Sequence, residues 1–311
     1  MGYARRLHGL EGSAMTRVGF VGLGNMGGRM ARRLVDAGQA VRGYDPAAGA
    51  ADKAGVRSSE SVLDLVAAVD HILLSLPDSQ VVESVILGSG GILENARQGQ
   101  VVVDMSTASP ASTRRLHARL GAIGVEFLDA GVSGGAAAAE KGTLTLMVGG
   151  CEEALAQVMC TLEPLAAKVF RMGGPGAGHS TKLLNNFLNA VNLAASSEVM
   201  VAAKKAGLDV AQVLDVINAS SGANWATQNR FPNVVRGDYL EGGLSSRLMM
   251  KDVLLYVEHL VDIGVPSLNS PGPISSFGVA IQRGYADLIS NRVVDAIGDL
   301  AGGIRLHTEP P

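Results

Sequence analysis

Short apolar runs alternate with helical stretches over the first half of the chain. Continuous β-branched runs such as Val101–Val103 suit strands that are buried on both faces, as in a parallel sheet. The helical stretches between the runs imply βαβ crossovers, so the pattern predicts a doubly wound α/β domain. The predicted strands are Arg17–Gly22, Ala40–Asp45, Asp70–Pro77, Gln100–Asp104, Val125–Ala130, Leu144–Val148 and Lys168–Met172.

The pattern changes after residue 172, where a glycine and proline cluster, Gly173–Gly176, interrupts the chain. The next 30 or so residues, Ala177–Ala206, contain no proline and close with Gly207, which predicts one long helix with a glycine stop. The remainder shows apolar helical stretches and little strand pattern. We therefore predict a tail over residues 1–14, an α/β domain over 15–175 and an all-helical domain over 176–311, which begins with the long helix. Met15 is a candidate for the true start of the protein.

The composition excludes several classes of protein. The 311 residues are 47% apolar and 18% charged, and the formal net charge is -3. A near-neutral balance without a Lys/Arg block argues against nucleic acid or an anionic membrane as the main partner. No apolar run reaches the length of a membrane span. Cys151 and Cys160 have neither zinc-site spacing nor a nearby Cys/His cluster, so we expect no metal, no disulfide and a cytoplasmic location.

A glycine-rich turn follows the first predicted strand and opens the first helix. The turn consists of Gly22, Leu23, Gly24, Asn25, Met26 and Gly27. In such a turn the first glycine permits the tight bend, the second lets backbone approach a pyrophosphate, and the third lets helix and strand pack closely. The helix N-terminus then offers free N–H groups to phosphates. This context predicts a Rossmann-type dinucleotide-binding domain.

The identity of the dinucleotide depends on Asp45, which ends the second predicted strand 18 residues after Gly27. A carboxylate at this place accepts hydrogen bonds from the adenosine ribose 2′-OH and repels a 2′-phosphate. Pro46 follows where NADP-binding proteins commonly place a cationic group. The sequence therefore favours NAD as the cofactor, with NADP as the less favoured alternative.

The long predicted helix carries a polar stripe on an otherwise apolar surface. Spacings of three and four residues place most of its polar side chains on one face. Because asparagine is a poor helix former, a stripe rich in asparagine indicates a cleft rather than a solvated face. Lys182, near the start, is suited to general acid/base chemistry, since desolvation lowers a lysine pKa. The stripe comprises Lys182, Asn185, Asn186, Asn189, Asn192, Ser196 and Ser197.

Six ordered motifs resemble those of the β-hydroxyacid dehydrogenases, and the resemblance covers roughly residues 17–300. The motifs are Gly19–Gly27, Asp104–Pro110, Asp129–Gly135, Gly142–Gly150, Gly178–Asn186 and Leu248–Asp252. Three positions depart from the family pattern. Gly131 stands where proline is usual, and we expect it to loosen the substrate loop. Leu244 replaces a common phenylalanine, and Asn224 replaces a common serine.

The resemblance implies a role for each matched substrate-site position. Lys182 is similar to the catalytic lysine that exchanges the proton of the substrate oxygen, and Asn186 to its substrate-contacting partner, with Asn185 a further candidate. Ser133, Gly134 and Gly135 are similar to the loop that binds the substrate carboxylate, since a nest of backbone N–H groups suits an anion. His179 also fits the family pattern, but we interpret it as a structural residue at the helix start.

The cofactor positions come from the same resemblance. Lys251 is similar to the lysine beside the nicotinamide, with Asp252 orienting it. Leu76 and Pro77 match the loop over the cofactor ribose, and Thr107 matches a residue near the nicotinamide.

These assignments predict an NAD-dependent oxidoreductase that interconverts a small β-hydroxyacid and its semialdehyde or ketone. A small carboxylate-bearing substrate and a homo-oligomer, dimer or tetramer, are the expected partners. The alternatives are an imine reductase, a 6-phosphogluconate dehydrogenase and a non-catalytic dinucleotide-binding relative. Lys182 counts against the first, the chain length against the second, and the presence of Lys182, Asn186 and the Ser-Gly-Gly loop against the third.

Overall fold

An eight-stranded sheet forms the core of the N-terminal domain in the computed structural model, which describes residues 16–307. The strand order is β3-β2-β1-β4-β5-β6-β7-β8, and β1 to β6 run parallel. The strands are β1 (Arg17–Val21), β2 (Ala40–Tyr44), β3 (Arg57–Ser58), β4 (His71–Leu74), β5 (Val101–Asp104), β6 (Glu126–Ser133), β7 (Leu144–Gly149) and β8 (Ala166–Gly173).

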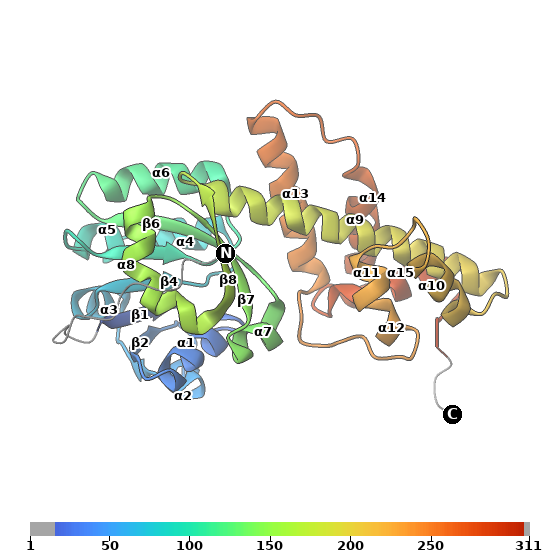
Figure 1. Cartoon of the computed structure of the whole chain (residues 1–311), viewed down its shortest axis with the longest axis horizontal. Coiled ribbons are helices and arrows are strands. Elements are labelled where there is room, and N and C mark those ends of the chain that lie inside the picture. The colour runs from blue at the N-terminus through green and yellow to red at the C-terminus, as the bar shows by residue number, and fades with distance from the viewer. Residues whose placement is uncertain (1–15, 308–311) are drawn as a thin grey trace.

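Helices cover both faces of this sheet (Figure 1). Alternation along β1 places Val18 and Phe20 against one helical layer and Val21 against the other, so the strand is apolar on both sides. The first layer contains α1 (Gly27–Asp36), α2 (Ala50–Ala54), α7 (Gly135–Lys141), α8 (Glu152–Leu162) and the 3₁₀ turn η1 (Glu163–Leu165). The second contains α3 (Val62–Ala68), α4 (Ser79–Leu87), α5 (Ile92–Asn95) and α6 (Pro110–Gly121).

The last two strands reverse direction, because β7 pairs antiparallel with β6 and β8 is parallel to β7. The sequence pattern predicted βαβ crossovers between the strands, and the β6–β7 connection departs from this pattern. The connection between β6 and β7 contains only the short helix α7 and a few flanking residues. A parallel crossover needs a dozen or more residues, so this connection can only turn the chain back beside β6.

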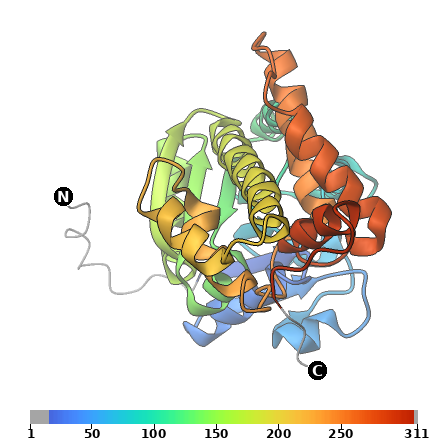
Figure 2. The same cartoon turned by 90° about the vertical axis from the view of Figure 1, so that its right-hand side faces the viewer.

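The C-terminal domain is helical and is built around one long helix, α9 (Ala177–Lys205), which extends from the sheet into the second domain (Figure 1). Helices α13 and α14 pack beside it (Figure 2). The remaining helices are α10 (Val210–Asn218), α11 (Trp225–Asn229), α12 (Phe231–Val234), α13 (Ser246–Asp262), α14 (Pro271–Ala280) and α15 (Val293–Leu300), with a π-helical turn η2 (Ile281–Tyr285) and a 3₁₀ turn η3 (Ser290–Arg292).

The predicted fold class is confirmed: a Rossmann-type sheet, a long inter-domain helix and an all-helical C-terminal domain. The predicted domain boundary at 175/176 falls between β8 and α9. The two-residue strand β3 was not predicted, because it is too short to produce an alternation. The predicted tail over residues 1–14 lies outside the described residues.

Candidate active site

The glycine turn between β1 and α1 has the geometry of a phosphate-binding loop. Gly22 has a φ of +89°, a backbone conformation that favours glycine. A Cβ on Gly27 would lie 1.9 Å from the carbonyl oxygen of Gly22, so only glycine lets the helix start this close to the strand. A Cβ on Gly24 would meet nothing within 4 Å. The turn is therefore closed towards the protein and open at Gly24, which fits the approach of a pyrophosphate.

Asp45 directly follows β2, and its carboxylate is hydrogen-bonded to the glycine turn. Its Oδ2 accepts a hydrogen bond of 2.7 Å from the backbone N–H of Leu23, and its Oδ1 accepts one of 2.8 Å from Ala47 N–H. Each carboxylate oxygen has a second lone pair, which leaves capacity for a ribose hydroxyl. Asp45 therefore connects the glycine turn to the edge where a ribose would bind.

Lys251 joins the two domains across the carboxyl ends of the strands. From α13, its Nζ donates hydrogen bonds to the carbonyl oxygens of Pro77 at 2.9 Å and Thr107 at 3.1 Å. The backbone N–H of Leu76 donates in turn to Ser106 Oγ, so the loops after β4 and β5 are held together. The structure thus brings together Leu76, Pro77, Thr107 and Lys251, four residues of the predicted cofactor site.

Asp252, beside Lys251 on α13, is buried and contacts two predicted site residues. Its Oδ2 accepts a 2.5 Å hydrogen bond from Asn186 Nδ2. Its Oδ1 lies 3.3 Å from Lys251 Nζ, an ion-pair contact that lacks hydrogen-bond geometry. The resemblance assigned Asp252 to Lys251 alone. The bond to Asn186 is a role that the sequence did not predict, because the two residues are 66 positions apart.

Lys182 lies half-buried on α9, one turn before Asn186. Burial lowers the pKa of its ammonium group, the positive charge of Lys251 lowers it further, and the negative charge of Asp252 opposes both effects. A lysine with a lowered pKa gives up its proton at a lower pH than a solvated lysine does, which suits it to general acid/base chemistry. Lys182, Asn186, Lys251 and Asp252 form one electrostatic cluster, which we call the lysine cluster.

One face of β6 positions the start of α9 against this cluster. Asp129 accepts hydrogen bonds from the backbone N–H groups of Gly176 at 2.8 Å and His179 at 2.7 Å, which fixes the first turn of the helix. Two residues on, Gly131 lies so close to α9 that a Cβ there would be 2.6 Å from Lys182 Cβ. The expectation of a loosened loop at Gly131 was wrong, because this glycine lies within β6 and makes room for the lysine stem.

Ser133 follows on the same face of β6, since side chains alternate along a strand. It therefore points to the side on which Lys182 lies, about 7 Å beyond Gly131. Gly134 and Gly135 have φ values of +128° and +70° and open the helix α7. The loop predicted to bind the substrate carboxylate thus follows directly from the strand that positions the lysine.

His179 and Asn185, two further residues of α9 that the sequence singled out, lie in different environments. His179 is fully buried, with Nδ1 2.7 Å from Thr113 Oγ1, which agrees with a structural residue at the helix start. Asn185 is exposed and donates to Asn186 Oδ1 at 3.3 Å. Asp129 was missed as a positioning residue, although an acid within an apolar strand was a usable signal.

The contact of Asn25 with the second domain is a further link across the site. Its Nδ2 donates to the carbonyl oxygen of Gly242 at 3.1 Å.

Met26 is the residue before α1 and packs against the core of the first layer. Leu244, at the departure from the family pattern, packs against the C-terminal core.

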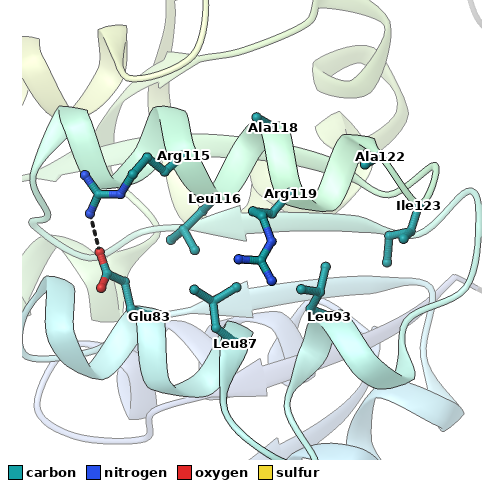
Figure 3. A pocket seen from close by; sticks show the side chains of 9 residues that line it. All are labelled: Glu83, Leu87, Leu93, Arg115, Leu116, Ala118, Arg119, Ala122 and Ile123. Atoms are coloured by element: carbon teal, nitrogen blue, oxygen red, sulfur yellow. Dashed lines mark hydrogen bonds and ion pairs between the residues drawn. The ribbon is translucent and has the colours of Figure 1, made fainter.

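A separate surface pocket lies between α4, α5 and α6 (Figure 3). It is lined mainly by apolar side chains, with an ion pair between Arg115 and Glu83 at its edge. None of the predicted site residues lines it. It therefore plays no part in the site described above.

Residues 16–307 contain neither a candidate metal site nor a candidate membrane span. No group of three or more His, Cys, Asp or Glu side chains there could hold a metal ion. No helix in that range is long and apolar enough to cross a membrane.

The chain matches two family models in sequence order. Residues 17–174 match the NAD binding domain of 6-phosphogluconate dehydrogenase, and residues 176–276 match the NAD-binding domain of NADP-dependent 3-hydroxyisobutyrate dehydrogenase. Among curated relatives, the NAD-dependent L-serine dehydrogenase of Pseudomonas aeruginosa is 35% identical over 283 residues, 88% of this chain and 95% of the relative. The 2-(hydroxymethyl)glutarate dehydrogenase of Eubacterium barkeri is 34% identical, over 80% of this chain and 84% of the relative.

Solved structures agree with these matches. The 3-hydroxyisobutyrate dehydrogenase of Mycobacterium tuberculosis, determined with L-serine, superposes with a TM-score of 0.81. It is 34% identical, and the alignment covers 92% of this chain and 99% of that one. The protein is thus an oxidoreductase that acts on CH–OH donors with a nicotinamide dinucleotide. The chain belongs to the β-hydroxyacid dehydrogenase family.

Proposed function

We propose that the protein is an NAD-dependent dehydrogenase that interconverts a small β-hydroxyacid and its semialdehyde, with Lys182 as the general acid/base. The observation that carries the proposal is the lysine cluster. It places a desolvated lysine of lowered pKa beside a buried amide and carboxylate. The cluster adjoins the loops that Lys251 ties to the strand ends.

The residues present suit a dinucleotide, since the glycine turn is open at Gly24 and Asp45 stands at the end of the next strand. Bound NAD supplies or accepts the hydride at its nicotinamide ring. Lys182 takes the hydroxyl proton during oxidation and returns it to the carbonyl oxygen during reduction. Asn186, held by Asp252, orients the substrate oxygen next to Lys182. The loop Ser133–Gly135 binds the substrate carboxylate through hydroxyl and backbone N–H groups.

Two alternatives predict different behaviour. An imine reductase has no need for a lysine that exchanges an alcohol proton, and a non-catalytic relative has no need for the lysine cluster. The desolvation that lowers the pKa of Lys182 disfavours its charged form, and such a cost is typical of functional groups. The cluster therefore favours the dehydrogenase over both alternatives.

The main test combines a substrate panel with variants of Lys182. Wild-type enzyme should reduce NAD⁺ with at least one compound among 3-hydroxyisobutyrate, glycerate, serine and 4-hydroxybutyrate. Lys182→Ala should lower kcat by about 10²- to 10⁴-fold, the usual contribution of a positioned acid/base group. Lys182→Arg should restore little activity, because a guanidinium remains protonated. NADH affinity, measured separately, should change little.

The proposal predicts different kinetics from a role in carboxylate binding. If Lys182 only bound the substrate carboxylate, KM would rise while kcat persisted, and arginine would restore activity. A Lys182→Ala enzyme with near-normal kcat would remove the lysine from the mechanism. Turnover of imines without turnover of any hydroxyacid would favour the imine reductase.

Cofactor choice has its own test at Asp45. The double variant Asp45→Ser, Pro46→Arg removes the charge repulsion and adds a phosphate partner, so its preference should shift from NADH towards NADPH. The measurement is kcat/KM for both cofactors with the same semialdehyde. A wild type that uses NADPH at least as well as NADH would contradict the proposal for Asp45.

A further inference from the structure

Arg230 lies between α11 and α12 as a half-buried cation without an acidic partner. No carboxylate within residues 16–307 lies within salt-bridge distance of its guanidinium; its recorded partners are neutral oxygens. They are Asn291 Oδ1 at 2.5 Å, Asn189 Oδ1 at 3.2 Å and Ser290 Oγ at 3.3 Å. Burial lowers the pKa of Arg230 to about 10. A desolvated charge of this kind costs stability unless an anion compensates it.

The position of Arg230 connects it to the active site through α9. Asn189, its partner, is seven residues after Lys182, which places both on nearly the same line of the helix and about 10 Å apart along its axis. Asn186 lies between them on the same stripe. A ligand that reaches Lys182 with its reacting carbon could therefore extend along the stripe towards Arg230.

The surroundings of Arg230 hold it in a fixed place and leave part of its hydrogen-bonding capacity unused. The guanidinium lies 5.2 Å from the ring centre of Trp225, a residue that is 56% exposed. Asn224 caps α11 and donates to Ser196 Oγ of α9 at 3.1 Å, which fixes the start of α11 on the long helix. The three recorded hydrogen bonds use three of the five guanidinium N–H groups. The others remain for a ligand.

We propose that Arg230, with Trp225 beside it, forms a distal subsite for a second carboxylate, so that the enzyme prefers dianionic β-hydroxyacids. Neutral amide and hydroxyl partners do not require a positive charge, whereas a carboxylate binds a guanidinium through two parallel hydrogen bonds. The inference rests on the proposed function and adds the chemical class of its substrate.

The kinetic test uses two substrates of nearly the same size, of which one carries the second negative charge and the other does not. One is 3-hydroxypropanoate with a 2-carboxyethyl side chain, and the other is the same compound with that side chain as its primary amide. Wild-type enzyme should favour the dianion in kcat/KM by about 10- to 100-fold, as expected for a hydrogen-bonded charge pair. Arg230→Gln should bring the ratio close to one, and Arg230→Lys should keep part of the preference.

The matched control is Arg236→Gln, since Arg236 is an exposed arginine whose recorded partner is Asn233. This variant should keep the wild-type ratio. If Arg230 were purely structural, Arg230→Gln would lower kcat/KM for both substrates in parallel and leave the ratio unchanged. That result, or a wild-type ratio of one, would overturn the inference.

A binding measurement separates this inference from the proposed function. Trp225 is the only tryptophan of the chain, so its fluorescence reports on the subsite without turnover. Glutarate should give a saturable change with the NADH complex, its monoamide a much weaker one, and Arg230→Gln should abolish the difference. If no β-hydroxyacid is oxidised but glutarate binds through Arg230, the proposed function fails and the subsite stands. If hydroxyacids are oxidised but glutarate and its monoamide bind equally well, the proposed function stands and only the proposed subsite is overturned.

Discussion

At the scale of single residues, Asp252 interacts with each of the three other members of the lysine cluster. It is buried, it accepts a hydrogen bond from Asn186, and its charge faces two lysines, Lys182 and Lys251. Its charge raises the pKa of Lys182, whereas burial and Lys251 lower it. If Lys182 is the general acid/base, as proposed, Asp252 acts on the proton transfer through its charge. Removal of the Asp252 charge alone should therefore change the pH at which Lys182 loses its proton.

Asp252→Asn should move the pH profile of oxidation to lower pH. The amide can still accept the hydrogen bond from Asn186, but the negative charge that favours protonated Lys182 is lost. In the proposed mechanism oxidation needs unprotonated Lys182, so kcat/KM should rise with pH through the pKa of this lysine, and a lower pKa should move that rise to lower pH. The measurement is kcat/KM against pH with NAD⁺.

The matched control for this profile is Asp262→Asn, at the exposed end of the same helix, which should leave the midpoint unchanged. A midpoint that stays in place or rises in Asp252→Asn would show that the Asp252 charge does not act on the group that titrates. A change in kcat alone would indicate a purely structural role.

At the scale of elements, α9 is positioned by its first turn. Gly176 and His179 donate their backbone N–H groups to separate oxygens of Asp129, which lies buried on β6. The negative charge also lies at the positive end of the helix dipole. Since Lys182 follows one turn later, the same contact sets the height of the lysine above Gly131. Strand β6 and helix α9 therefore form a single unit.

Asp129→Asn should destabilise the protein and impair catalysis together. The amide has one oxygen, so its NH₂ group would face one of the two N–H donors and leave it without an acceptor. An unsatisfied buried donor costs about 1–3 kcal/mol. The free energy of unfolding should fall by that amount in denaturant titrations.

Asp215→Asn is the control, because Asp215 is exposed on α10 and should change stability by less than about 0.5 kcal/mol. If Asp129→Asn proves as stable as this control, Asp129 does not anchor α9.

At the scale of the whole molecule, α9 carries an apolar stripe that residues 16–307 leave exposed. Leu184, Leu188, Ala195 and Val199 are exposed, and their spacings place them on one face of the helix. Leu188 alone is 62% exposed. Continuous exposed apolar patches typically mark contacts with other proteins. We propose that a second copy of the chain covers this stripe.

The enzyme should therefore sediment as a dimer or larger oligomer at micromolar concentration. Leu188→Glu should shift it towards monomer, because association would bury an unpaired charge. Val216→Glu, at a comparably exposed apolar position on α10, should leave the oligomer intact. Wild-type protein that remains monomeric at micromolar concentration would contradict the proposal.

The sequence by itself determined the fold class, the long helix and the candidate residues. Local signals suffice for these features, because strand and helix periodicity, the glycine turn and the helix stop each depend on residues close in the chain. The predicted helix Ala177–Ala206 differs from α9 by one residue. The motif at Gly22–Gly27 likewise identified the turn whose geometry the structure shows.

Only the tertiary structure decided which of these residues act on one another. The bond between Asn186 and Asp252, the bridge from Lys251 to Pro77 and the neutral surroundings of Arg230 all join residues far apart in sequence. Their distances depend on how two domains pack around α9, and the same packing buries Lys182 and so lowers its pKa. A one-dimensional pattern records which side chains are present, but the electrostatic energy between them depends on separation and solvent exposure.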